Sequence, residues 1–599
     1  MITSPTKRSA AALAALLLAG VAVPAIGQQD KPESLLPPGF DQPETSPTPS
    51  PAAPRPAPTT PLAPIPAPIG APGNTIAGDD TALGNVAAAE VPAQQIDLSK
   101  YELPEFARHS LDRVGIRAAG NAAFPANGFG KADGRTLMVL LNRLKAPIAS
   151  RWASIALRRA LMSPLDTPRH VNGADFAAQR AWVLLHMGEA NAARAVINDV
   201  DVDNYTTRLF QVAMQTALAT ADPGQICPFA ENGAQAIHQR GWALAKAMCA
   251  GLAGKPNEAG QLLDQARWGT PVSDIDSLLS EKILGTGAQG RRAVTLEWAG
   301  ITRLTAWRWG LATASGEDIP DDLYATAAPQ VRYWQALAPQ IAPAKRAAAA
   351  ELAASAGVFS SAGLVDLYSE IADGDDAGDA ARVARDLRTA YTGSDVNDRL
   401  KAIRSLWDGA ASPRGRYARL ILTARAASWV PADAKIEEPE RLIASMLSAG
   451  LEARAMEWRS AVKPGSEAWV LIELADPAPN RASGYGDFEG YGDAAGRRKA
   501  QLAFAGLAGL GRFSAGDAQR GATQFDVAIG AANAWTRAID QAGQRGDSAM
   551  VALLAAVGMQ STNWASVTPE GLFHVVAAMR AAGLGDYARM IAVEAVSRA

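Results

Sequence analysis

The sequence predicts an all-α protein: an α-solenoid of stacked helical hairpins that follows a disordered, proline-rich N-terminal segment. Apolar residues recur at helix spacing through most of the chain beyond residue 97, and the alternating runs typical of strands are nearly absent. The 599 residues, 48% of them hydrophobic, suffice for a large core. The chain has 57 basic and 60 acidic side chains, and the resulting net charge of -3 does not favour binding to nucleic acid or to an anionic membrane.

Residues 1–27 have the features of a secretory signal peptide. The basic pair Lys7-Arg8 precedes an apolar run from about Ala10 to Val23, and Ala25 and Gly27 supply small residues at the spacing that signal peptidase needs. That run is shorter than the ~20 residues of a membrane-spanning helix. With no cysteine at the cleavage site, we expect a mature chain that is soluble in the periplasm and is not a lipoprotein.

Residues 28–97 are rich in proline, alanine, threonine and serine, which predicts a disordered tether that favours the polyproline II conformation. The tether is either a spacer or a proline-rich ligand for a partner. Within it, Asp30 to Asp41 holds clustered large apolar residues, so this stretch is its best candidate docking motif.

Residues 98–599 form the predicted helical-repeat domain, with 101–134 partly irregular. Helix starts are indicated at Ser412-Pro413 and Thr568-Pro569, because proline is favoured at the first helical position. A turn also recurs in which glycine is followed by alanine after five residues and by a large apolar residue three later. Its copies are Gly188/Ala193/Val196, Gly254/Ala259/Leu262, Gly450/Ala455/Trp458 and Gly583/Ala588/Ile591. Glycine permits a left-handed end to the first helix, and alanine permits close approach of the second.

These turns resemble those of the tetratricopeptide (TPR) family, whose repeat joins two helices through a glycine and an alanine with four residues between them, the same spacing as here. A second small position, twelve residues after the glycine, is matched by Ala266 and Ala595 but not by Val200 or Val462. The copies are thus degenerate and TPR-like. The resemblance implies a protein or peptide partner. The peptide-contacting residues of the family cannot be assigned in this chain, because no copy matches the motif well enough.

A weaker resemblance links the alanine-rich helices to the superhelical, non-catalytic part of soluble lytic transglycosylases. Gly558-Met559-Gln560 is similar to a segment of the catalytic domain of those enzymes. However, the Glu-Ser pair of that domain occurs here only as Glu33-Ser34, within the tether. The chain therefore resembles the superhelical part of these enzymes without their catalytic domain.

Cys227 and Cys249 are the two cysteines of the chain. In an oxidising compartment they either form a disulfide, which by its loop length would stabilise the fold by about 3 kcal/mol, or remain two small buried apolar side chains. The sequence leaves both alternatives open.

No catalytic, cofactor-binding or metal-binding residues are predicted. The five histidines stand far apart, and the G-x-G-x-x-G stretch from Gly285 to Gly290 follows a helical pattern, whereas a dinucleotide site follows a strand. The acidic runs at 199–203 and 373–376 lack the glutamate of a calcium loop, so we interpret these acids as helix caps. The chain is expected not to be an enzyme and to need no cofactor.

Residues 480–495 are predicted to form a Gly/Tyr/Asp loop. Its candidate ligand-binding side chains are Tyr485, Asp487, Phe488, Glu489, Tyr491 and Asp493. Carboxylates and aromatic rings on a flexible loop suit a cation, a sugar or a basic peptide, and the alternative is a disordered excursion between hairpins.

The leading functional hypothesis is a non-enzymatic periplasmic scaffold or adaptor that binds a protein or peptide partner on the surface of its helical stack. One alternative is a cell-envelope glycan-binding or glycan-processing protein. Another is a purely structural spacer.

Overall fold

The computed structural model describes residues 104–116, 124–144, 147–269, 271, 274–287, 294–374, 378–478 and 482–599. The predicted signal peptide, the tether and its candidate docking motif lie outside these residues. The chain divides into two units. One comprises 42–108, of which the short 3-10 helix η2 (Glu105–Ala107) is described, and the other contains the helical residues 109–599.

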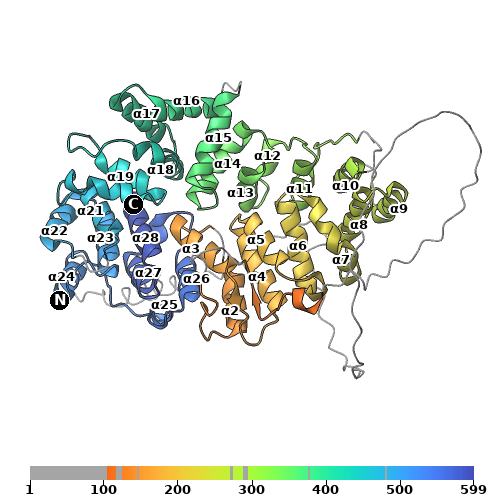
Figure 1. The fold of residues 1–599 in the computed structure, drawn as a ribbon, viewed down its shortest axis with the longest axis horizontal. Coiled ribbons are helices and arrows are strands. Elements are labelled where there is room, and N and C mark those ends of the chain that lie inside the picture. Colours follow the sequence, from red (N-terminus) through yellow and green to blue (C-terminus); the bar gives the residue numbers. More distant parts are fainter. Residues whose placement is uncertain are drawn as a thin grey trace, which may run out of the picture. The chain divides into compact units, whose positions relative to one another are not determined.

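The all-α prediction is confirmed, since helices make up nearly all the regular structure of the described residues (Figure 1). Those of the first half are α2 (Gly134–Arg143), α3 (Arg151–Met162), α4 (Gly173–His186), α5 (Ala190–Asn198), α6 (Thr207–Ala219), α7 (Ala230–Ala236), α8 (Arg240–Leu252), α9 (Pro256–Arg267), α10 (Ile275–Gly287), α11 (Ala306–Ala314), α12 (Asp321–Tyr324), α13 (Gln330–Leu337) and α14 (Pro343–Ser355).

The second half is also built of helices joined by short connections. Its helices are α15 (Ser361–Asp373), α16 (Asp379–Thr392), α17 (Val396–Asp408), α18 (Pro413–Ala427), α19 (Pro439–Ser448), α20 (Glu452–Met456), α21 (Glu467–Ala475), α22 (Tyr485–Ala494), α23 (Arg497–Gly509), α24 (Ala515–Gln524), α25 (Ala534–Arg545), α26 (Ser548–Gly558), α27 (Pro569–Ala581) and α28 (Gly585–Ser597). Short 3-10 helices are η3 (Val202–Asn204), η4 (Pro223–Phe229), η5 (Glu457–Ser460) and η6 (Trp564–Ser566).

The described residues contain one small sheet. Its strands β1 (Arg113–Val114) and β2 (Leu165–Asp166) pair antiparallel, with Arg113 opposite Asp166 and Val114 opposite Leu165. This sheet lies against α4, where the buried Arg180 donates hydrogen bonds to the carbonyl oxygens of Val114 (2.8 Å) and Leu161 (2.9 Å).

All four glycine turns join two packed helices, as predicted. The pairs are α4 with α5, α8 with α9, α19 with α20, and α27 with α28. The glycines have positive φ angles of 86° (Gly188), 75° (Gly254), 76° (Gly450) and 79° (Gly583). The alanine of every copy is fully buried, which leaves room for the two helix axes to approach closely.

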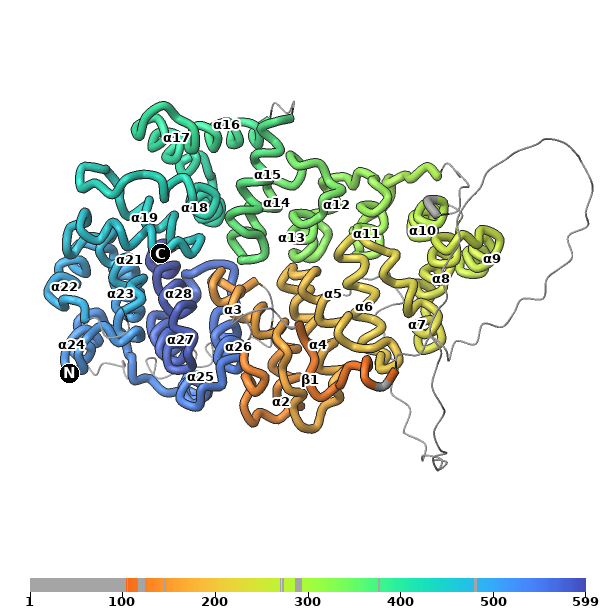
Figure 2. Tube along the Cα trace, in the orientation of Figure 1, coloured from red at the N-terminus to blue at the C-terminus, as the bar shows by residue number. Residues whose placement is uncertain are grey.

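The stack closes on itself, because α3 near its start packs against α26 and α28 near its end (Figure 2). Glu594 of α28 joins these two regions: its carboxylate accepts hydrogen bonds from Ser150 Oγ (2.6 Å) and from the backbone N–H of Arg151 (2.9 Å), at the N-terminus of α3. On another side of α3, the Arg151 guanidinium donates to the carbonyl oxygens of Ala354 and Phe359. Helix α3 is thus held by contacts to the middle and to the end of the chain.

The core of residues 109–599 is largely continuous and rich in alanine and tryptophan. The tryptophans with the least exposure are Trp242, Trp307, Trp309, Trp334 and Trp458. Among the described helices, none is both long and apolar enough to cross a membrane.

Candidate functional site

A cavity of about 650 Å³ lies among five consecutive helices, α14 to α18. This size falls within the range of small-ligand sites and of pockets that receive part of a peptide. In the following paragraphs we call it the α14–α18 groove. Its lining residues are Ala344, Ala347, Ala348, Glu351, Tyr368, Asp379, Ala380, Arg382, Val383, Asp386, Ser405, Leu406, Gly409 and Arg419.

The groove exists because α14 presents small side chains to it. Pro343 occupies the first position of α14, and alanines dominate the helix that follows. Ala347 is buried, whereas Ala348 is exposed and lines the groove. Since an alanine fills little volume, the space between α14 and the α16–α17 hairpin stays open.

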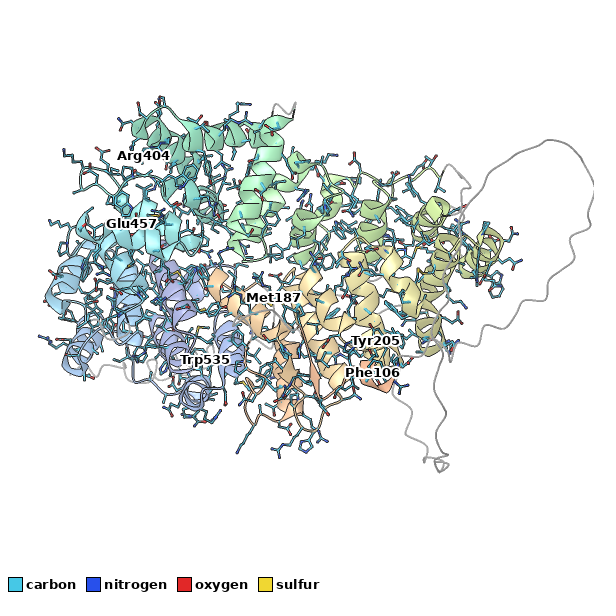
Figure 3. All side chains as sticks on the ribbon, viewed as in Figure 1. Phe106, Met187, Tyr205, Arg404, Glu457 and Trp535 are labelled. Atoms are coloured by element: carbon cyan, nitrogen blue, oxygen red, sulfur yellow. A yellow bond between two sulfur atoms is a disulfide. The ribbon has the colours of Figure 1, made fainter. Side chains whose placement is uncertain are left out.

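The α16–α17 hairpin is fixed from its outer side by ion pairs to the segment that leads into α19. Arg404 of α17, labelled in Figure 3, pairs with Glu438 at 3.2 Å, and Arg441 of α19 pairs with Asp408 at 2.6 Å. The Arg441 guanidinium also lies 4.7 Å from the Trp407 ring centroid. These contacts hold one wall of the groove in place.

Glu351, Tyr368 and Arg419 form a connected group in the opposite wall. The Tyr368 hydroxyl donates a hydrogen bond to Glu351, and Arg419 Nε lies 2.8 Å from Glu351 Oε1. Burial, reinforced by the charge of Glu351, raises the pKa of Tyr368 well above its usual range. Tyr368 therefore stays protonated and keeps donating to Glu351 at any physiological pH.

Arg419 combines deep burial with unused hydrogen-bonding capacity. Its side chain is 12% exposed, and its terminal nitrogens make no hydrogen bond to any described residue. The guanidinium carbon lies 5.9 Å from the Tyr368 ring centroid, so the ring and Glu351 together fix its orientation. The arrangement leaves N–H donors at the groove wall for a ligand oxygen.

The α16 side of the groove carries the remaining charges. Arg382 pairs with Asp379 at 3.2 Å near the first turn of α16. Asp386 accepts a hydrogen bond from Ser405 Oγ at 3.0 Å and has no ion-pair partner among the described residues. The groove therefore offers donors on one wall and a carboxylate acceptor on the other.

No family model, curated protein or solved structure matches this chain.

The predicted loop conformation of 480–495 is wrong, because Tyr485–Ala494 is the helix α22. Phe488 is fully buried, with its ring centroid 5.3–5.4 Å from those of Phe513 and Phe525. Tyr485, Phe488 and Tyr491 follow one another at three-residue spacing, which places them on one helix face. That spacing was the available helix signal, and the flexible glycines between the rings obscured it.

The three carboxylates of α22 do not share one helix face, although Glu489 and Asp493, four residues apart, do. Asp487, Glu489 and Asp493 are all exposed, and Asp487 lies on the opposite side of the helix from Glu489. Tyr485 donates its hydroxyl to Gln524 at 2.8 Å.

Among the predicted ligand residues, Tyr491 lines a cavity. It is 3% exposed, its hydroxyl has no hydrogen-bond partner among the described residues, and it lines a space of about 570 Å³ between the starts of α21 and α23. Two ion pairs lie there, Lys499 with Glu467 at 2.9 Å and Arg497 with Asp526 at 2.9 Å, while Arg498 donates to the backbone carbonyl oxygens of Trp564 and Val567.

Cys227 and Cys249 are joined by a disulfide, with their Cα atoms 5.3 Å apart. The bond links η4 to α8, next to the aromatic cluster of Phe210, Phe229 and Trp242. Its position within a packed hairpin indicates a structural role.

The acids interpreted as helix caps bind an earlier segment instead. Asp199 accepts a hydrogen bond from the Gly115 N–H at 2.7 Å, and Asp201 accepts from the backbone N–H of His109 at 2.8 Å. In the second run, Asp373 pairs with Arg388, and residues 375–376 lie outside the described residues. The cap interpretation is wrong for Asp199 and Asp201, because their hydrogen-bond partners are distant in sequence, and it is not tested at 375–376.

The remaining sequence motifs are the glycine-rich stretch that starts at Gly285 and the residue His186. The glycine-rich stretch follows a helical segment, as expected, but its first three residues belong to that helix, because α10 extends through Gly287; its end lies outside the described residues. His186 contacts the Trp182 carbonyl at 2.9 Å, and burial lowers its pKa. Within the described residues, no three metal-ligating side chains cluster.

Proposed function

We propose that this protein is a periplasmic helical scaffold that binds a segment of a partner polypeptide in the α14–α18 groove. The observation that carries the proposal is the groove itself, in which an alanine floor adjoins the N–H donors of Arg419 and the carboxylate acceptor of Asp386. A polypeptide presents carbonyl oxygens and N–H groups along its whole length, so this combination suits its main chain. The periplasmic location follows from the predicted signal peptide.

The alternative of a glycan-binding or glycan-processing protein rested on the carboxylates at 487–493. Since α22 places Asp487 on the opposite side of the helix from Glu489, the three carboxylates do not form one cluster, and no specific observation favours that alternative. The spacer alternative leaves the groove without a purpose.

Site-specific photocrosslinking in cells tests the proposal. A photoreactive amino acid replaces Ala348, which lines the groove, and in a matched control it replaces Ala362, an exposed alanine of α15 that does not line the groove. We expect one discrete adduct from position 348 and none from position 362.

The partner found in the adduct is then purified, and its affinity for this protein is measured directly. Ala348→Trp fills the groove with a large ring at an exposed position, so the fold should be retained and the affinity should fall by about tenfold or more. Equal affinity for the wild type and Ala348→Trp, at unchanged melting temperature, would place the binding site elsewhere.

A further inference from the structure

The charges that line the α14–α18 groove cancel except at one position. Glu351 pairs with Arg419, and Asp379 pairs with Arg382. Asp386 is the lining carboxylate that forms no ion pair with any described residue, and it accepts a hydrogen bond from Ser405. The groove therefore carries one uncompensated negative charge.

We propose that the ligand of the groove is a basic peptide segment whose cation binds Asp386, an inference that rests on the proposed function. A lysine or arginine side chain, or an N-terminal ammonium group, supplies the missing charge. A carboxylate oxygen with one serine donor has lone pairs to spare for such a group. The partner is thus distinguished by charge complementarity with the groove.

The remaining lining residues also suit a basic peptide better than an acidic one. Because Glu351 already neutralises Arg419, the free N–H groups of Arg419 are better matched to a neutral main-chain carbonyl oxygen than to a second carboxylate. Ala344 and Ala348 leave space beside these groups for a small or slender side chain. Acidic segments would meet Asp386 and be repelled.

A phage-displayed library of random linear peptides, selected on the mature chain, provides the probe. We expect the selected peptides to be enriched in lysine or arginine. Synthetic copies with each basic side chain made neutral, or with the N-terminus acetylated, show which kind of cation is bound. Fluorescence polarisation gives the affinities.

The deciding variant is Asp386→Asn, which keeps an oxygen to accept the Ser405 hydrogen bond. Its matched control is Asp398→Asn on α17, because Asp398 also accepts a hydrogen bond from one serine hydroxyl (Ser394 Oγ, 2.6 Å) and lies outside the groove lining. We expect affinity for the selected peptides to fall about tenfold in Asp386→Asn and to be unchanged in Asp398→Asn.

The possible failures are distinct. If the selected peptides lose binding in Ala348→Trp but are neutral or acidic, or bind Asp386→Asn as well as the wild type, the groove binds peptides and the basic-ligand inference is wrong. If no peptides are enriched, or if Ala348→Trp binds them normally, the proposed peptide-binding function of the groove is wrong as well.

Discussion

Removing the Glu594 carboxylate should release the contact between the two ends of the helical stack. The side chain is fully buried, and its oxygens accept hydrogen bonds from Ser150 Oγ (2.6 Å), the Arg151 N–H (2.9 Å) and Arg598 Nη1 (2.6 Å). Glu594 thus caps α3 from a helix more than 400 residues later in the chain. Its loss would leave the start of α3 and the Arg598 guanidinium without their main partner.

The expected magnitude follows from this environment. Breaking a buried ion pair by removing one partner costs about 3–5 kcal/mol, because the remaining charge is left uncompensated. We therefore expect Glu594→Ala to lose about 3–5 kcal/mol of stability. Glu594→Gln keeps the shape and one acceptor oxygen, so a smaller loss of about 1–3 kcal/mol is expected.

Urea unfolding followed by circular dichroism measures the loss, and amide hydrogen exchange locates it. Protection should fall first in α3 and α28, since these helices share the contact. Glu489→Gln is the control, because Glu489 is exposed on α22. The reasoning is refuted if Glu594→Ala unfolds at the same urea concentration as Glu489→Gln and exchange in α3 is unchanged.

Two further predictions concern packing and pH. Ala588→Leu should destabilise the protein by about 1–3 kcal/mol, because the alanine is fully buried where α27 meets α28. Ala581→Leu, at the exposed end of α27, is the control and should leave the melting temperature unchanged; equal melting temperatures for the two variants would contradict the prediction. Burial raises the pKa of Glu189 to about 7, against the opposing effect of Arg158 at 2.8 Å. Between pH 4.5 and about 7 the folded state keeps the Glu189 proton, whereas the unfolded state has lost it. The stabilisation from this group should therefore be fully present below pH 4.5 and be lost as the pH rises toward 7. Glu189→Gln should flatten that decline in urea titrations, and parallel pH profiles would show the assignment to be wrong.

The hairpin turns were predictable because their requirements are local. A glycine such as Gly450 is needed for a positive φ angle, and an alanine such as Ala455 is needed one turn into the next helix, so both can be read from a few adjacent residues. The helix starts at Pro413 and Pro569 have the same local origin, and both are capped by the preceding hydroxyl side chain.

The α22 error shows where local reasoning failed. Glycine content favoured a loop at 485–493, yet Phe488 is buried against Phe513 and Phe525, two residues that the local sequence does not include. Burial of an aromatic ring can outweigh the helix cost of a glycine, which is about 1 kcal/mol. Tertiary packing therefore decided the conformation of this segment.

By itself, the sequence determined the helical class and the positions of the glycine turns, because backbone preference and apolar spacing act over a few residues. Only the tertiary structure decided that α3 meets α28 and that Glu351, Asp386 and Arg419 share one groove. These side chains lie on separate helices, at spacings that carry no recognisable pattern. Their charges acquire partners, or are left without one as at Asp386, only when the helices pack.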